Sequence, residues 1–372
     1  MSASPPNAAE LRAAFDGPAP LTVGVEEELM LLDPESLDLA PRADDALGAL
    51  AGDTRYKLEL PASHLEITLG PLDGAATAAA ELASARARLV DAVAGIARPA
   101  AAGVHPFAAA EGELNRGARY DRTLAEHATV ARRQLVCALQ VHVAVGSADA
   151  TLAVHNALRS YLPELAALAA NAPLHEGRDT GLASIRPVLG GMLPRQGVPP
   201  AIPSWEAYAD ALRWGAESGT VPEPAVWWWE LRPHPSFGTL ELRVPDAQVT
   251  VADAEAITAM AHALVAWLAG RHADGDPLGS DPTWRIAENR WSACRYGVEG
   301  TLADLETGAR RSTREVLAER LATLAPVAAR LGGQAGLAHA HTLLEANGAM
   351  HQRQVAADAG AHGVAAWLAE QF

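Results

Sequence analysis

The stretch Thr22–Leu29 reads TVGVEEEL, and its alternation of apolar and acidic residues predicts a strand within residues 21–32. Side chains alternate between the two faces of a strand, so Glu26 and Glu28 share one face while Glu27 points to the other. We therefore expect Glu26 and Glu28 to act together and Glu27 to lie apart from them.

Three other regions repeat this pattern of a polar face backed by apolar residues. They read SHLEIT at residues 63–68, QVHVAVG at 140–146, and two strands at 226–232 and 239–244 that are joined by PHPSFG. The last two predict an antiparallel hairpin with a long loop. The polar faces of these strands carry His64, Glu66, Gln140, His142, Glu230, Arg232, Thr239, Glu241 and Arg243.

Long helical stretches separate the strands without a regular strand–helix alternation. We expect helices at residues 75–97, 152–170, 253–271, 302–331 and 337–370, and one that begins at Ser204. This order favours an α+β fold, with an open antiparallel sheet flanked by helices, over a doubly wound parallel sheet.

The chain is expected to form one domain preceded by an arm. Residues 1–20 are rich in proline and alanine and predict a flexible N-terminal arm with a short helix at Glu10–Phe15, whereas residues 21–372 predict a single catalytic domain with a helical C-terminal part. Residues 187–203 are rich in proline and glycine and predict a loop, which is either a lid over the site or a plain surface loop.

The charge balance of the chain excludes several classes of partner. The 372 residues include 29 basic and 45 acidic side chains, for a formal net charge of −16, and Lys57 is the only lysine. An acidic surface repels nucleic acids and anionic membranes, and Lys57 does not lie in a Walker-type phosphate loop. The sequence also shows no Cys-x-x-Cys pair, no leader of the secretory type and no long uncharged apolar run, so we expect a cytoplasmic protein.

Acidic side chains gathered on one sheet face would repel one another, and a divalent cation relieves that repulsion. Hard carboxylate ligands suit Mg²⁺ or Mn²⁺, whereas zinc prefers histidine and cysteine. The predicted metal ligands are Glu26, Glu28, Glu66 and Glu241. Arg232 and Arg243 suit bidentate binding of a carboxylate or a phosphate. The alternative is that each polar face simply meets solvent, as in many half-buried antiparallel sheets.

Six motifs in this order resemble the carboxylate–amine ligases of the glutamate–cysteine ligase type 2 family. They span residues 21 to about 300 and read VGVEEE at 23–28, HLEIT at 64–68, QVHV at 140–143, GRDTGLAS at 177–184, GTLELRVPD at 238–246 and ENRWSACRYG at 288–297. The resemblance implies a fold like that of glutamine synthetase and the guanidino kinases, in which an open antiparallel sheet holds ATP and Mg²⁺.

The same resemblance implies roles for individual residues. Glu26, Glu28, Glu66 and Glu241 match metal carboxylates. His142 and Arg243 match residues that face phosphate or substrate, and Arg232 or Arg178 would hold the carboxylate or the transferred phosphoryl group. Arg290, Arg178 and Trp228 are further predicted contacts of the nucleotide, with Trp228 a platform for the adenine. This chain has alanine at 169, 170 and 172 and leucine at 182, where the family commonly has serines and a tyrosine, so the acceptor amine stays open.

The leading functional hypothesis is an ATP-dependent ligase that forms an amide through an acyl phosphate, with glutamate and cysteine as the substrates that the resemblance suggests. One alternative is a phosphotransferase of the guanidino-kinase kind, and another is an inactive nucleotide- or metal-binding protein. The expected partners are a small carboxylate and a small amine, and the resemblance also implies a homodimer.

Other side chains that bear chemistry are assigned to packing or solvent. We expect the C-terminal histidines His339, His341 and His351 to lie on a solvated or packed helix face. Trp227, Trp229 and Cys137 are expected to lie in the core, and Cys294 is not expected to be a nucleophile.

Overall fold

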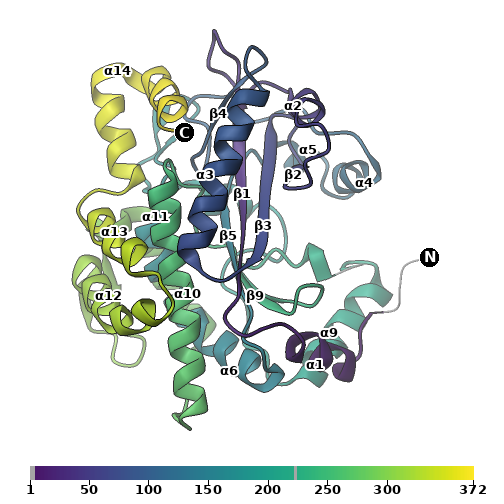
Figure 1. The fold of residues 1–372 in the computed structure, drawn as a ribbon, viewed down its shortest axis with the longest axis vertical. Helices are drawn as coiled ribbons and strands as arrows, with labels where there is room; N and C mark the ends of the chain where they lie inside the picture. The colour runs from purple at the N-terminus through teal and green to yellow at the C-terminus, as the bar shows by residue number, and fades with distance from the viewer. Residues whose placement is uncertain (1–4, 222–223) are drawn as a thin grey trace.

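The computed structural model describes residues 5–221 and 224–372, and at its centre lies one antiparallel sheet (Figure 1). The strand order is β2-β3-β1-β5-β9-β8, and β4 pairs with the far end of β1. These strands are β1 (Val23–Leu32), β2 (Tyr56–Leu58), β3 (His64–Leu72), β4 (Arg98–Ala100), β5 (Leu139–Val143), β8 (Leu231–His234) and β9 (Thr239–Leu242). All of these pairings are antiparallel, which confirms the expected α+β class.

The helices and two small hairpins surround this sheet. The helices are α1 (Ala8–Asp16), α2 (Ala43–Ala49), α3 (Ala75–Ala92), α4 (Ala118–His127), α5 (Thr129–Arg132), α6 (Ala148–Leu158), α7 (Leu162–Leu168), α8 (Arg186–Gly190), α9 (Trp205–Ser218), α10 (Val251–Ala273), α11 (Thr283–Tyr296), α12 (Thr313–Arg330), α13 (Gln334–Glu345) and α14 (Gly348–Gln371). The hairpins are β6 (Leu174–His175) with β7 (Arg178–Asp179), and β10 (Thr301–Ala303) with β11 (Arg310–Ser312).

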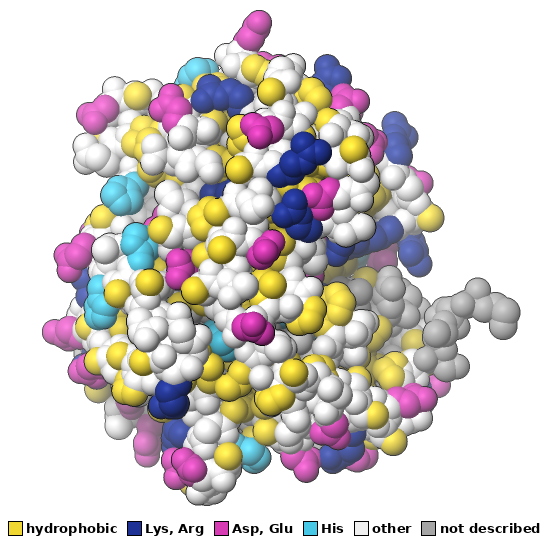
Figure 2. Space-filling model, in the orientation of Figure 1, with side chains coloured by type: hydrophobic (Ala, Val, Ile, Leu, Met, Phe, Trp, Pro, Cys, Tyr) yellow, Lys and Arg dark blue, Asp and Glu magenta, His cyan; other side chains and the backbone are white. Residues whose placement is uncertain are grey.

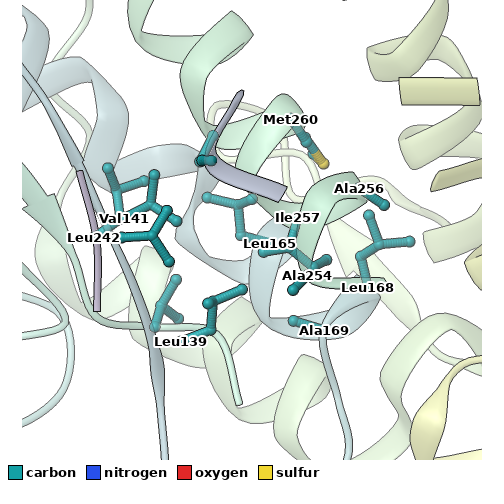
Figure 3. Close-up of a cluster of buried hydrophobic side chains, with 14 of the residues drawn as sticks. Leu139, Val141, Leu165, Leu168, Ala169, Leu242, Ala254, Ala256, Ile257 and Met260 are labelled. Carbon is teal, nitrogen blue, oxygen red and sulfur yellow. The ribbon is translucent and has the colours of Figure 1, made fainter. Parts of the chain in front are cut away.

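The apolar face of the sheet is covered by α3 and α10, which lie side by side in front of the strands in Figure 1. In Figure 3, Val141 and Leu242 from neighbouring strands lie close to Leu165 of α7 and Ile257 of α10. Burial of one such side chain stabilises the fold by about 1.5–3 kcal/mol. Because this face is sealed by helices, the opposite face of the sheet is the one left for chemistry.

The helix α10 is long and apolar enough, by length and composition alone, to cross a membrane. In the structure, 67% of its most apolar window is buried inside the protein. This is the environment of a core helix, and α10 contacts α3, α6 and α13 along its length.

The N-terminal arm differs from the expectation of a flexible segment. Residues 1–4 lie outside the described residues, but α1 forms and packs against the protein: Leu11 and Phe15 are fully buried, and Phe15 stacks on Trp205 of α9 with ring centroids 4.8 Å apart. The expectation treated a proline-rich flank as a loose arm, whereas an amphipathic first helix gains stability by burying its apolar side.

Several element boundaries also differ. The helix expected at 302–331 begins only at Thr313, because residues 301–312 form the β10–β11 hairpin, with Gly308 at φ +78° in its turn. The C-terminal helix expected at 337–370 breaks between α13 and α14, where the Asn347 side chain caps α14. The start at Ser204 is confirmed, since its hydroxyl accepts a hydrogen bond from the backbone N–H of Ala207.

Acidic and basic side chains are scattered over the helix-covered side of the molecule, and histidines follow its edge along α13 and α14 (Figure 2). His339 is hydrogen-bonded to Asp253 at 2.8 Å, whereas His351 lies near Trp367. Within the described parts of the chain, no group of metal-ligating side chains forms around these histidines. His339 is half-buried and His341 and His351 are exposed, so these histidines lie on a partly exposed helix surface, as expected.

Candidate active site

Three rows of side chains cross the sheet face that lies opposite α3 and α10. Residues that are directly paired in an antiparallel sheet project to the same face. The first row holds Lys57, Glu66 and Glu28, the second holds Thr68, Glu26 and Gln140, and the third holds Gly24, His142, Glu241 and Arg232. The structure thus brings together the four predicted metal acids and two of the predicted catalytic residues.

A cleft of about 340 Å³ opens over this face. Glu26, Glu28 and Glu66 form part of its floor, and Arg232 and Arg243 also line it. A smaller compartment of about 80 Å³ adjoins the cleft and shares Glu28 and Arg243 with it. The site therefore has room for more than one small ligand around a shared acidic centre.

Three predicted residues converge at the centre of the face. Glu26, His142 and Glu241 each offer a ligand atom, and these atoms lie within 4.8 Å of one another. The Nε2 atom of His142 lies 3.6 Å from Oε1 of Glu26 and has no hydrogen-bond partner among the described residues. The bare backbone of Gly24 leaves space beside His142, because a Cβ atom at Gly24 would lie 3.3 Å from the His142 Cβ.

The ring of His142 is held by Thr239, whose hydroxyl oxygen is hydrogen-bonded to Nδ1 at 3.0 Å. This contact orients the ring so that Nε2 faces Glu26, and the tautomer in which Nδ1–H donates to Thr239 would leave the Nε2 lone pair for a metal ion. A hydrogen bond to the far nitrogen is the usual way in which a protein orients a metal-binding histidine.

Glu241 is fully buried and is paired with both arginines. Arg232 donates to its two oxygens at 2.6 and 3.0 Å, and Arg243 donates a third hydrogen bond. Burial alone would raise the pKa of Glu241, but the charges of Arg243 and Arg232 lower it. A carboxylate has about four lone-pair directions, so three N–H donors leave one for a cation.

The other acids of the floor repel one another. Burial, followed by the charge of Glu59, raises the pKa of Glu28 to about 7, and the same two causes with Glu26 raise the pKa of Glu66 well above its usual value. Glu26 differs, because its contacts with His142 outweigh burial and lower its pKa to about 2. This is the repulsion that the sequence predicted, and a bound cation would relieve it.

The residues fit a divalent metal ion. Ligand atoms of Glu26, His142 and Glu241 lie within 4.8 Å of one another, the Nε2 of His142 has no partner among the described residues, and Glu28 and Glu66 line the cleft with Glu26. Carboxylates with one imidazole suit Mg²⁺ or Mn²⁺.

Glu59 and four basic side chains line the cleft but were missed in the sequence. The basic residues are Lys57, Arg119, Arg122 and Arg195. Lys57 and Glu59 are two positions apart, so their alternation extends the polar face of β2 and could have signalled them. Arg119, Arg122 and Arg195 come from α4 and from the 187–203 loop, where no periodic pattern marks a site.

Of the three residues predicted to contact the nucleotide, the structure brings only Trp228 to the described lining of the cleft. Trp228 lines the cleft, and the Arg195 guanidinium lies 5.4 Å from its ring centroid. Arg290 is instead buried and makes a bidentate ion pair with Glu230, at 2.7–3.0 Å. Arg178 lies exposed on the β6–β7 hairpin, and neither Arg290 nor Arg178 is among the described residues that line the cleft.

The structure thus does not bring Arg290 and Arg178 to the cleft, and their assignment to the nucleotide stays a prediction. Position within a family-like motif does not show whether a guanidinium is already neutralised by a neighbour, as Arg290 is. Trp227 is partly buried and its ring lies 5.3 Å from that of Tyr208, as expected for packing. Cys137 and Cys294 are both buried, and burial raises the pKa of each thiol.

The 187–203 loop contributes Leu193, Arg195 and Gln196 to the cleft. It is fixed at several points: Arg159 donates to the carbonyl of Pro199 at 2.8 Å, and the backbone N–H of Glu230 donates to that of Gly197. The loop is thus a wall of the cleft.

Glutamate–cysteine ligase family 2 matches the chain over residues 22–366. The chain is 36% identical to a candidate glutamate–cysteine ligase 2-3 of Rubrobacter xylanophilus, over 97% of this chain and 99% of that one. It is 33% identical to a candidate glutamate–cysteine ligase 2 of Gloeobacter violaceus, over 90% and 92% of the two chains.

Two solved structures share the fold. A glutamate–cysteine ligase of Francisella tularensis in complex with AMP has a TM-score of 0.70 at 11% identity, covering 94% of this chain and 88% of that one. A bifunctional glutathione synthetase of Pasteurella multocida has a TM-score of 0.62 at 13% identity, covering 98% of this chain and 53% of that one.

An acidic sheet face lined with arginine, in a chain with these relatives, defines a carbon–nitrogen ligase of the carboxylate–amine class. The chain belongs to glutamate–cysteine ligase family 2. The resemblance drawn from the six motifs is confirmed, and the match continues past residue 300 into the C-terminal helices.

Proposed function

We propose that the protein uses ATP and Mg²⁺ to join a small carboxylate to a small amine, with glutamate and cysteine as the first pair to test. The convergence of Glu26, His142 and Glu241 within 4.8 Å carries this proposal, because these three side chains could hold a divalent metal ion and Glu26 lines a cleft that also holds several cations. The names of the relatives support the choice of substrates.

The proposed reaction has two steps. A carboxylate oxygen of the first substrate attacks the γ-phosphorus of ATP, the bond between that phosphorus and the bridging oxygen breaks, and ADP leaves. The amine nitrogen then attacks the acyl carbon, the carbon–oxygen bond to the phosphate breaks, and the amide and inorganic phosphate form. The amine proton passes to solvent or to a base in the cleft.

The side chains of this chain bind and orient the reactants. Glu26, His142 and Glu241 would hold a metal ion, with Glu28, Glu59 and Glu66 completing the acidic floor. When bound, Mg²⁺ neutralises charge on the phosphates. Arg243 and Arg232 line the cleft beside the metal site, where they can stabilise the transferred phosphoryl group or hold the substrate carboxylate.

The cations around the mouth would receive the remaining phosphate charge. Lys57, Arg119, Arg122 and Arg195 line the cleft around the acidic floor, and Trp228 offers a face for adenine stacking. The alanines at 169, 170 and 172 are buried, and among the described residues that line the cleft none of them occurs. We infer that these substitutions leave the cleft itself unchanged, so cysteine stays a valid first choice of amine.

ADP release tests this function. Purified protein is mixed with ATP, Mg²⁺ and a matrix of carboxylates and amines, and each product is identified by mass spectrometry. We expect ADP, phosphate and an amide in equal amounts for at least one pair, dependent on Mg²⁺ and abolished by Glu26→Gln. A phosphorylated amine without an amide would instead indicate a phosphotransferase, and no turnover with any pair would contradict the ligase proposal. The same proposal places the protein in the reducing cytoplasm, where cysteine is available as a free thiol.

A further inference from the structure

The helix α4 is attached to the protein mainly through its two ends. All residues from Arg116 to Val130 are described, and none of them is buried. The flanking residues Asn115 and Ala131 are buried, and the Asn115 side chain donates to the carbonyls of Glu59 and Pro61 at 2.7 and 3.1 Å. Residues 116–130 therefore form a segment without fully buried side chains between two fixed points.

Each end of α4 has an unusual backbone conformation. Gly117, before the helix, has φ +132°, and Ala128, after it, has φ +49° and ψ −134°. A positive φ is strained for alanine, and such strain persists only where the surrounding structure imposes it. Rotation at these two residues would turn the helix as a unit while its internal hydrogen bonds stay intact.

The helix forms a roof over the cleft. Six of its ten residues line the cleft: Arg119, Tyr120, Arg122, Thr123, Glu126 and His127. The Tyr120 hydroxyl donates to the carbonyl of Leu58 at 2.7 Å, and the His127 ring meets Trp228 edge-on at 5.6 Å between centroids. Leu58 belongs to β2 and Trp228 precedes β8, and these strands are the opposite ends of the sheet.

Residues 116–130 are held less tightly than the rest of the cleft wall, because none of their side chains is fully buried. Local opening is cheapest where few apolar side chains are buried and the backbone is exposed. In Figure 1, α4 lies beyond β2 and away from the α3–α10 layer that stabilises the sheet. By contrast, the 187–203 loop has buried side chains, Leu193, Val198 and Ile202, and fixed carbonyls.

We propose that α4 is a hinged lid, which opens at Gly117 and Ala128 to admit the nucleotide and closes when Arg119 and Arg122 meet its phosphates. Two exposed guanidiniums gain charge-assisted hydrogen bonds only in the closed, liganded state, so phosphate binding shifts the equilibrium toward closure. Closure also keeps water from the acyl phosphate. The link to the nucleotide rests on the proposed function, whereas the hinged opening does not.

The opening is tested first without nucleotide, by hydrogen exchange of the full chain. Tyr120→Phe removes the donor to Leu58, and Ala125→Ser, on the exposed side of the same helix, is the matched control. We expect amides at 116–130 to exchange at least threefold faster in the Tyr120→Phe variant, with unchanged rates in the control and unchanged rates beyond Asn115 and Ala131. Equal exchange rates in the parent, Tyr120→Phe and Ala125→Ser, or faster exchange that extends into the sheet, would contradict the proposal that α4 is a lid.

The closure is tested with Mg²⁺ and a non-hydrolysable ATP analogue, whose binding is measured separately by calorimetry. We expect amide exchange at 116–130 in the parent to slow at least tenfold when the analogue is bound. In an Arg119→Gln, Arg122→Gln double variant, binding of the analogue should slow it less than threefold. A bound analogue with unchanged exchange at 116–130 would overturn the closure. An analogue that does not bind contradicts the proposed function instead, and the comparison without nucleotide still decides whether α4 opens.

Discussion

Lys57 on β2 and Glu66 on β3 are paired directly across the sheet, so the only lysine of the chain stands beside the acidic floor of the cleft. A lysine is a flexible point charge that suits phosphate without fixed geometry. Lys57 does not lie in a Walker-type phosphate loop, and the structure instead places it among the cations of the cleft.

Lys57→Gln should therefore weaken nucleotide binding. Loss of one exposed charge contact with a phosphate costs about 1 kcal/mol, which corresponds to roughly a fivefold rise in the KM for ATP. The turnover number should change less, because Lys57 lies at the rim and not at the metal site. Steady-state kinetics measure both, and Arg330→Gln, at an exposed position on α12, is the control that should leave the KM unchanged.

Strand periodicity explains why much of the site could be predicted. The alternation in Thr22–Leu29 and in the hairpin is local, and it groups Glu26 with Glu28 and Glu241 with Arg243. The pairing of β1, β5 and β9 then brings these acids to one face of the sheet. Glu66 followed from the same rule, because register in a sheet with one buried face is strongly specified.

The features that could not be predicted from the sequence depend on contacts between distant segments or on the geometry of a turn. Whether Arg290 is free for a ligand depends on Glu230, which lies 60 residues away. Arg119 and Arg122 lie on α4, in which no residue is buried, and what they face depends on the distant strands that form the floor of the cleft. The 302–331 region was assigned as one helix because its alanines, leucines and glutamates favour that state, but Gly308 and the side chain of Asp304, which accepts from the N–H groups of Glu306 and Thr307, make a turn.

Glu26→Gln should abolish metal-dependent turnover while the fold persists. Glu26 is the ionised acid that faces the unpartnered nitrogen of His142, and it is not paired with an arginine among the described residues. Its replacement also removes a charge that repels Glu66, so unfolding stability should stay within about 1 kcal/mol of the parent. Calorimetric titration with Mg²⁺ or Mn²⁺ should show at least a tenfold loss of affinity.

Glu241→Gln is a poorer test of the metal site than Glu26→Gln, although glutamine has nearly the same shape as glutamate. This change leaves Arg232 and Arg243 without their shared carboxylate, and breaking a buried ion pair costs about 3–5 kcal/mol. Activity and stability should fall together in this variant, as measured by ADP release and urea unfolding. Loss of activity with full stability would show that the two arginines find other partners.

Glu27→Gln should give the opposite result to Glu26→Gln at the neighbouring position. Glu27 is fully buried on the helix side of β1, where Arg86 of α3 donates to both its oxygens at 2.6 and 2.9 Å and also to the carbonyls of Gln248 and Val249. Loss of the carboxylate charge leaves the Arg86 cation buried and should lower the free energy of unfolding by about 3–5 kcal/mol.

Specific activity per folded molecule should stay near that of the parent in this variant, since Glu27 does not face the cleft. Urea unfolding followed by tryptophan fluorescence measures the first quantity, and ADP release below the unfolding transition measures the second. A stable but inactive Glu27→Gln protein would mean that the side-chain parity of β1 is wrong.

His105 should make the protein less stable in acid. Its Nδ1 accepts hydrogen bonds from the N–H groups of Phe107 and Ala108, so Nε2–H donates to the carbonyl of Leu37 at 2.9 Å and the buried ring is neutral. Burial lowers its pKa to about 4, against about 6.5 in the unfolded chain. Between these values the unfolded chain binds the proton and the folded one does not, so stability is present above pH 6.5 and is lost as the pH falls toward 4.

By this linkage His105 alone removes about 2 kcal/mol between pH 7.5 and 5. His105→Asn keeps an acceptor for the two N–H groups and removes the titration. It should be less stable than the parent at pH 7.5, by about 1–3 kcal/mol for the lost bond to Leu37, but should lose less stability on acidification. Urea unfolding at pH 7.5, 6 and 5 measures how the free energy of unfolding depends on pH in the parent and in His105→Asn. Glu28 changes charge in the same pH range, but its contribution is the same in both proteins and cancels in the difference between them. Parallel slopes would show that the pKa of His105 is the same in the folded and the unfolded protein.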